Sequence, residues 1–255
     1  MYFDHCPRCG KPNGGWQYCP ACGCDFEDPY DLAVVNGEIS QCNKAHTDVK
    51  LPDGVISVAD ETFRLCDKLE SVKFPATLKK IGKMAFAYCE KLNGIRLPDG
   101  ITEIAEGTFL HCRQLSKILL PDNLKSIGGR AFAHCTELKT LILPDGVTDI
   151  GEGAFCCCYD LRIINIPVGV TRIRQSTFEQ CAKLERIKLP YGVEVIERDA
   201  FSGCVRLSVI EIPSGVKRIE SRAFFECSEL KSAYVAKDCE IAADAFPENC
   251  KITLV

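Results

Sequence analysis

Eighteen cysteines among 255 residues are the side chains of this sequence best suited to chemistry. Four of them form two Cys-x-x-Cys pairs, Cys6 with Cys9 and Cys19 with Cys22, and each pair is followed directly by a glycine. Two such turns supply four thiolates, the ligand set of a tetrahedral structural zinc ion. We therefore predict one Zn²⁺ bound by these four cysteines. Four sulfur ligands leave no open coordination position, so the predicted zinc is structural and not catalytic.

Two other chemistries fit these pairs less well. A redox-active Cys-x-x-Cys is expected beside a β-α-β pattern, and the sequence shows none. Disulfides need an oxidising compartment, whereas residues 1–6 lack the basic and apolar regions of a secretory signal, so we expect a cytoplasmic protein. His5 and Cys24 lie beside the four ligands as alternative ligands. The duplicated Cys-Pro-x-Cys-Gly motif makes residues 3–24 similar to the zinc-ribbon family.

A second cysteine population follows a strict period of 23 residues. A phenylalanine recurs at this spacing from Phe63 to Phe224, and a leucine follows it by six residues. Between the two, three residues after each phenylalanine, stand Cys66, Cys89, Cys112, Cys135, Cys158, Cys181, Cys204 and Cys227. Residues 49–255 therefore hold about nine units of 23 residues, a repeat length typical of solenoids.

One unit, residues 138–158, indicates how the chain winds. Leu141 and Leu143 flank an outward residue in a short strand, and Pro144-Asp145-Gly146 forms a turn. A second extended segment follows over 147–150, and residues 151–158 suit a helical turn that returns the chain to its start. A lone unit cannot bury its apolar face, so stacked units are expected to form continuous ladders.

The recurring Leu-Pro-Asp-Gly-Val and Ala-Phe-x-x-Cys signatures resemble the BspA-type leucine-rich repeats of bacterial cell-surface and other interaction proteins. The resemblance covers residue 49 to about residue 250 and implies a binding scaffold without catalysis. We expect an α/β-type solenoid that is mostly β: a leucine-rich repeat superhelix of about nine 23-residue units, preceded by a small zinc ribbon.

The expected organisation has three parts. Residues 1–24 form the zinc ribbon, residues 25–48 a linker and N-terminal capping hairpin, and residues 49–255 the solenoid. The hairpin is predicted from Asn36-Gly37, a type I′ turn sequence between two apolar runs. At the other end, residues 251–255 read as an apolar strand, and an exposed edge favours pairing with another chain. We hypothesise weak self-association through this C-terminal edge.

The eight repeat cysteines are predicted to be core residues, because free cysteine packs as a small hydrophobe. Cys156 and Cys157 stand beside one of them, either incidentally or as thiols that bind metal or oxidise. The sequence assigns no role to Cys24, Cys42, Cys239 and Cys250.

Catalytic motifs are lacking in the sequence, and we predict that the protein is not an enzyme. It contains no phosphate-binding glycine loop, Gly-x-Ser-x-Gly elbow or His-Glu-x-x-His motif. His111 and His134 lie one repeat apart and are expected to stack on neighbouring rungs. Such a pair would bind a metal or respond to pH, or would simply occupy a variable surface position.

Function is therefore expected on the outward strand residues. Three cations open this column and two aliphatic residues occupy its middle, with a third in the preceding outward column. An exposed apolar patch with a polar rim is typical of a partner-binding site. The predicted partner-binding residues are Lys50, Lys73, Arg96, Leu119, Ile142, Ile163 and Tyr234.

The charge and hydropathy of the sequence argue against two other classes of protein. The net charge of −4 does not suit a generally basic nucleic-acid-binding chain, and no stretch approaches the ~20 apolar residues of a membrane span. We predict a non-enzymatic scaffold for a protein or peptide partner, acidic at one end. A cell-surface adhesion or antigen protein is the alternative, and nucleic-acid binding through the zinc ribbon is the second alternative.

Overall fold

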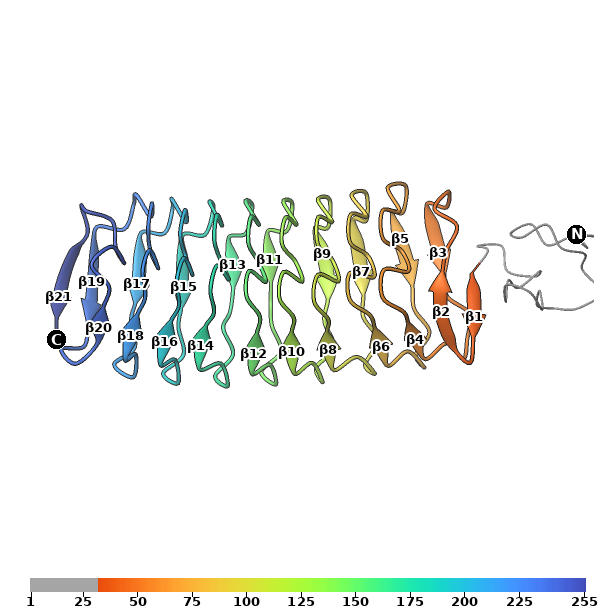
Figure 1. The fold of residues 1–255 in the computed structure, drawn as a ribbon, viewed down its shortest axis with the longest axis horizontal. Helices are drawn as coiled ribbons and strands as arrows, with labels where there is room; N and C mark the ends of the chain where they lie inside the picture. The colour runs from red at the N-terminus through yellow and green to blue at the C-terminus, as the bar shows by residue number, and fades with distance from the viewer. Residues whose placement is uncertain (1–31) are drawn as a thin grey trace, which may run out of the picture.

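The computed structural model describes residues 32–255, which form a solenoid of about nine rungs with two strand ladders (Figure 1). We call the ladder made by the first strand of each rung ladder A. It consists of β3 (Asp48–Lys50), β5 (Ser71–Lys73), β7 (Gly94–Arg96), β9 (Lys117–Leu119), β11 (Thr140–Leu141), β13 (Ile163–Ile164), β15 (Arg186–Lys188), β17 (Val209–Glu211), β19 (Ser232–Val235) and β21 (Lys251–Leu254).

Ladder B is made by the second strand of each rung. It consists of β2 (Glu38–Gln41), β4 (Ser57–Val58), β6 (Lys80–Ile81), β8 (Glu103–Ile104), β10 (Ser126–Ile127), β12 (Asp149–Ile150), β14 (Arg172–Ile173), β16 (Val195–Ile196), β18 (Arg218–Ile219) and β20 (Glu240–Ile241). Pairing within both ladders is parallel, and each is interrupted into shorter sheets, such as β3-β5-β7-β9 in ladder A.

The N-terminal hairpin is present as expected. β1 (Ala33–Val35) pairs antiparallel with β2. Asn36 and Gly37 between them have positive φ angles of 49° and 77°, as a type I′ turn requires. β2 then pairs in parallel with β4, so the hairpin covers the open edge of ladder B at its first rung.

The expected helical return is wrong, and residues 32–255 contain no helix. In the rung of residues 151–158, the N–H groups of Gly153, Phe155 and Cys157 donate to carbonyls of the next rung at 2.7–2.9 Å. The intervening N–H groups bond back three residues within the rung. In a helix every N–H group would point along the helix axis. Here every second N–H group instead forms a hydrogen bond to the next rung. The α/β description therefore becomes an all-β one.

Left-handed residues produce this alternation. Gly153 has φ 60° and Cys157 has φ 57°, and two residues per rung repeat the conformation at 23-residue spacing, mostly without glycine. The left-handed region costs an L-residue about 1–2 kcal/mol. Backbone hydrogen bonds to the neighbouring rung offset that cost at otherwise unpaired buried N–H groups.

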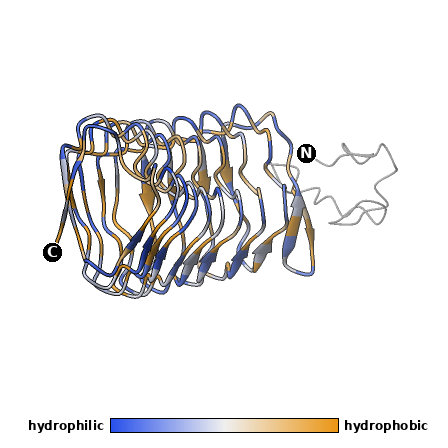
Figure 2. Ribbon diagram, turned by 60° about the vertical axis from the view of Figure 1, so that its left-hand side comes forward, coloured by the Kyte–Doolittle hydropathy of each residue, from blue (hydrophilic) through white to orange (hydrophobic). Residues whose placement is uncertain are grey.

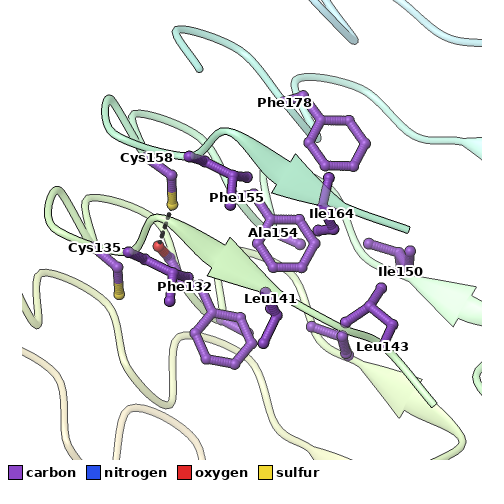
Figure 3. Packing of buried hydrophobic residues seen from close by; sticks show 14 of the residues in the cluster. Phe132, Cys135, Leu141, Leu143, Ile150, Ala154, Phe155, Cys158, Ile164 and Phe178 are labelled. Atoms are coloured by element: carbon purple, nitrogen blue, oxygen red, sulfur yellow. Dashed lines mark hydrogen bonds between the residues drawn. The ribbon is translucent and has the colours of Figure 1, made fainter. Parts of the chain in front are cut away.

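The core consists of aligned side-chain columns between the two ladders. Consecutive phenylalanine rings from Phe63 to Phe246 stack with centroids 4.8–5.7 Å apart and interplanar angles of 3–17°. Figure 3 shows Phe132, Phe155 and Phe178 in one such column. Figure 2 shows apolar and polar segments alternating along the rungs. The predicted burial of the repeat phenylalanines is confirmed.

The eight repeat cysteines are buried as predicted, and seven of them also act as hydrogen-bond donors. The Cys158 thiol donates to the carbonyl oxygen of Phe132 in the preceding rung, with Sγ and O 3.1 Å apart (Figure 3). Cys89, Cys112, Cys135, Cys181, Cys204 and Cys227 make the equivalent bond at 3.0–3.2 Å. The cysteine column therefore fills volume and also links successive rungs.

Candidate interaction surface on ladder A

Strand geometry fixes which side chains ladder A presents. Side chains alternate between the two faces of a strand, so Leu141 and Leu143 point into the core and Ile142 points outward. The parallel register then aligns equivalent residues of neighbouring rungs, such as Thr140 with Ile163. The outward column predicted from the sequence is therefore a continuous surface.

The predicted apolar residues lie on three consecutive rungs. Leu119, Ile142 and Ile163 are between 56% and 62% exposed, on or directly after β9, β11 and β13, which lie side by side (Figure 1). Tyr234, at 59% exposed, lies on β19, four rungs beyond Ile142 and apart from the cluster. We call Leu119, Ile142 and Ile163 the apolar patch.

Cations surround the apolar patch on the same face. Lys50, Lys73 and Arg96 are exposed on consecutive rungs before it, and Lys117 accompanies Leu119 on β9. Arg186 and Lys188 follow on β15. None of these six cations takes part in an ion pair within residues 32–255, although charges elsewhere on the rungs pair, as in Arg174 with Asp149 at 2.8 Å. Ladder A thus carries unneutralised positive charge on a chain of net charge −4.

Sequence reasoning missed Val209. Its side chain is 48% exposed and lines a shallow hollow of about 540 Å³ together with Ile163, Arg186, Lys188 and Glu211. Val209 stands in the same outward column as Ile163, two repeats later, so extending that column would have found it. The exposed apolar surface consequently reaches from β9 to β17, with Arg186 and Lys188 on the rung between Ile163 and Val209.

Asn165 lies in the outward column, but its side chain is hydrogen-bonded to the backbone of the preceding rung. Its side-chain amide accepts a hydrogen bond from the Leu143 N–H at 2.7 Å and donates to the Leu143 carbonyl at 2.9 Å. The side chain thereby replaces the strand pairing that has ended at this point of β11 and β13. Asn165 is accordingly a structural residue.

The stacking of the two histidines is confirmed. The rings of His111 and His134 lie 4.0 Å apart between centroids at an interplanar angle of 7°, and Tyr88 stacks on His111 at 4.7 Å. Burial, followed by the charges of His134 and Arg113, lowers the pKa of His111. Burial and then Arg113 lower the pKa of His134. Both shifts favour the neutral form of the two imidazoles.

The predicted zinc ligands belong to residues 1–24. Cys6, Cys9, Cys19 and Cys22, together with the proposed ribbon of residues 1–24, lie outside the described residues. Within residues 32–255, no group of three or more histidine, cysteine, aspartate or glutamate side chains is arranged to hold a metal ion. The same part of the chain has no helix of the length and apolarity needed to cross a membrane.

Comparison with solved structures identifies similar solenoids. A leucine-rich repeat protein from Bacteroides ovatus is 28% identical, with a TM-score of 0.78 over 89% of this chain and 70% of the other. A leucine-rich repeat protein of T. pallidum is also 28% identical, with a TM-score of 0.56 over 84% and 90%. The pneumococcal vaccine antigen PcpA shares the fold at 18% identity, with a TM-score of 0.54 over 81% and 68%.

No curated protein matches the chain. The family model described as the BspA type leucine-rich repeat region matches residues 38–162 and 148–255, which together include every rung of the solenoid. The repeat signatures, the stacked rungs and this match agree, and the chain belongs to the BspA-type leucine-rich repeat family.

Proposed function

We propose that this protein is a non-enzymatic scaffold that binds a protein or peptide through ladder A. The observation that carries the proposal is an exposed apolar patch on consecutive strands, surrounded by cations that form no ion pair within residues 32–255. An apolar centre with a polar rim is the usual anatomy of a protein interface. The repeat fold supports this role, because solenoids commonly bind partners along an extended face.

The charge of ladder A indicates the kind of partner. From β3 to β19, two outward columns carry six cations and two carboxylates, Asp48 and Glu211. A partner with an acidic segment and at least one apolar anchor would complement both features. Complementary charge mainly raises the association rate and the specificity, while a buried apolar anchor supplies most of the affinity.

Affinity capture followed by measurement with the purified partner tests the proposal. The double variant Leu119→Asp/Ile142→Asp places two carboxylates in the apolar patch and should weaken binding at least about 100-fold, from roughly 3 kcal/mol lost at the interface centre. The matched control is Val168→Asp/Tyr191→Asp. Val168 and Tyr191 are 80% and 83% exposed and stand where other repeats have the turn aspartate. Equal weakening by both double variants would refute the assignment of the face.

We propose a structural zinc ion for residues 1–24, held by Cys6, Cys9, Cys19 and Cys22. Support comes from the spacing of the two Cys-x-x-Cys pairs alone. Zinc analysis of the purified full chain should give one ion per chain, and Cys9→Ser should lose it. A wild-type protein free of zinc after purification without chelators would contradict this proposal.

We propose a cytoplasmic location, with the cell surface as the alternative. Apart from Cys42, the cysteines of residues 32–255 are free thiols, which suits a reducing compartment. The printed description of the pneumococcal relative as a vaccine antigen concerns a protein of 18% identity, so it supports the alternative only weakly. Cell fractionation with thiol labelling separates the two: extracellular protein with oxidised cysteines would favour the surface role.

We also propose weak self-association through the C-terminal edge. Within residues 32–255, β21 pairs with β19 and with no other strand, and Ile252, Leu254 and Val255 at this end are exposed. An unpaired strand edge favours pairing with a second chain. Light scattering should therefore show a mass that rises with concentration, and a constant monomer mass would remove this proposal.

A further inference from the structure

Two thiols outside the cysteine column lie in contact. The Sγ atoms of Cys156 and Cys157 are 3.6 Å apart, and both side chains are partly exposed. The repeat cysteines, by contrast, are fully covered, and seven of them donate to phenylalanine carbonyls. Cys156 and Cys157 therefore differ from the structural cysteines in accessibility and in their partner.

The backbone holds the two sulfurs in this arrangement from both sides. The Cys157 N–H donates to Glu179 of the next rung at 2.7 Å, and the Cys156 carbonyl accepts from the His134 N–H of the preceding rung at 2.8 Å. The left-handed conformation of Cys157, with φ 57°, breaks the alternation that would direct neighbouring side chains apart. The pair is thus positioned by two rungs before any ligand arrives.

The sulfur separation distinguishes between two kinds of dithiol chemistry. A disulfide needs an S–S distance of about 2.05 Å and a Cα–Cα distance above about 4.4 Å, whereas adjacent Cα atoms are about 3.8 Å apart. A disulfide between neighbours is consequently strained. Two thiolates on one soft ion, at ion–sulfur distances of about 2.3 Å, lie roughly 3.3 Å apart at the angles of a pyramidal ion and roughly 3.8 Å apart at those of a tetrahedral ion. The observed 3.6 Å is close to the bite of a shared ion.

We propose that Cys156 and Cys157 form a two-sulfur binding site for a thiophilic metal or metalloid ion, of which trivalent arsenic is the probe of choice. Thiolates are the ligands that such soft ions prefer. The site shares no residue with the proposed zinc ribbon or with the apolar patch. It supplies two protein ligands, which agrees with the lack of any three-residue metal cluster in residues 32–255.

The surroundings favour the thiolate that a ligand requires. A hydrogen bond from the Cys156 thiol, and a second from the Tyr159 hydroxyl, lower the pKa of Cys157. The same hydrogen bond raises the pKa of Cys156, and burial and the charge of Glu179 raise the pKa of both thiols. Since the thiolate is the nucleophile and the metal ligand, Cys157 is the sulfur expected to bind first.

Phenylarsine oxide tests the site, because its single arsenic atom bonds two thiols. The As=O group and two S–H groups become two As–S bonds and one water molecule, without a change of oxidation state. The zinc-loaded full chain is incubated with the probe, and the bound equivalents are counted by intact-mass spectrometry and located by peptide mapping. The adduct should survive excess monothiol and dissociate with a competing dithiol.

Two variants introduce residues that other repeats carry at the equivalent positions. Cys156→Ala places the residue found at Ala87 and Ala133 in the same slot, and Cys157→Gln copies Gln180. Each should lose one equivalent of arsenical while keeping the wild-type melting temperature. Cys239→Ser, which removes a half-buried thiol that makes no thiol pair, should keep the wild-type stoichiometry.

Equal arsenical binding by wild type and both variants would overturn the proposal. The proposal would also be overturned if the adducts mapped to other cysteines or if excess monothiol removed them. Wild-type chains that carry a Cys156–Cys157 disulfide after purification under a reductant that keeps Cys239 free would overturn it as well. Failure here leaves the proposed partner face intact, because no residue is shared.

Discussion

Replacing one ring of the phenylalanine column perturbs the solenoid most informatively. Phe132 is fully buried, and its ring stacks on Phe109 at 5.4 Å and on Phe155 at 5.6 Å. Phe132→Ala removes the buried ring and leaves a cavity between two rigid rungs, at a cost of about 3–5 kcal/mol. Phe132→Leu keeps most of the apolar volume. It loses two ring contacts, each worth about 0.5–1.5 kcal/mol, and should cost about 1–3 kcal/mol.

The end of the column provides the matched control. Phe246 has one stacked neighbour within the column, Phe224 at 4.8 Å, and lies on the last rung with 9% of its surface exposed. Fewer atoms surround its ring, and that end of the solenoid can relax around a smaller side chain. Phe246→Ala should therefore cost less than Phe132→Ala.

Urea unfolding followed by circular dichroism measures the effect as a shift in midpoint at constant slope. Because each rung contacts only its neighbours, hydrogen exchange in Phe132→Ala should accelerate first in the rungs of Phe109 and Phe155. If Phe132→Ala shifted the midpoint no more than Phe246→Ala, the reasoning from stacked rungs would be refuted.

Three further perturbations follow from the same geometry. Cys135→Ala removes a buried thiol and its hydrogen bond and should lower the free energy of unfolding by about 1–2 kcal/mol. Cys250 is half-buried near the C-terminal end of the solenoid, and Cys250→Ala should change that free energy by less than about 0.5 kcal/mol. Equal unfolding midpoints for the two variants would contradict the donor role of Cys135. Folding lowers the pKa values of His111 and His134, so the unfolded chain binds more protons than the folded chain. The stability that this pair contributes should be fully present above about pH 6.5, the ordinary pKa of histidine. It should be lost as the pH falls through the lower folded-state pKa values. The double variant with glutamine at both positions should flatten this melting-temperature profile between pH 7.5 and 5, and an unchanged slope would exclude the pair as its cause. Lys73→Glu should weaken partner binding roughly fivefold at low salt, from about 1 kcal/mol of exposed charge interaction, and the difference should shrink at high salt; a salt-independent effect would contradict an electrostatic role.

Much of the fold was predictable because one period governs it. The spacing of Phe63 through Phe224 requires the rings to align, and the repeat cysteines must then align beside them. Asn36-Gly37 likewise permits the two positive φ angles that its hairpin turn requires. In these cases a local sequence preference and the stacking of rungs favour the same structure.

The return segment was not predictable in the same way. Residues such as Cys157 and His134 adopt left-handed conformations that their own preferences disfavour. The compensating hydrogen bonds go to the next rung, 22 residues along the chain, so a reading of one unit alone favours a helical turn. The thiol donation by Cys158 has no local sequence signature for the same reason, because its acceptor lies 26 residues earlier.

The partner face was predictable in its centre but not in its extent. Alternation along a strand is a local rule, so the exposure of Leu119 and Ile142 follows directly from it. The engagement of Asn165 by the Leu143 backbone depends on where strand pairing stops. The hollow beside Val209 depends on how long side chains of three rungs lie together. Neither feature has a signature within a single repeat.

A photo-crosslinking side chain at position 142 tests the proposed partner face most directly. Position 142 lies in the apolar patch on ladder A, and the control position, Thr148, is exposed just before β12 of ladder B on the same rung. With the full chain expressed in its native cells, we predict that irradiation links one partner through position 142 and not through position 148. Crosslinks to that partner of equal yield from both positions, or from position 148 alone, would contradict the account.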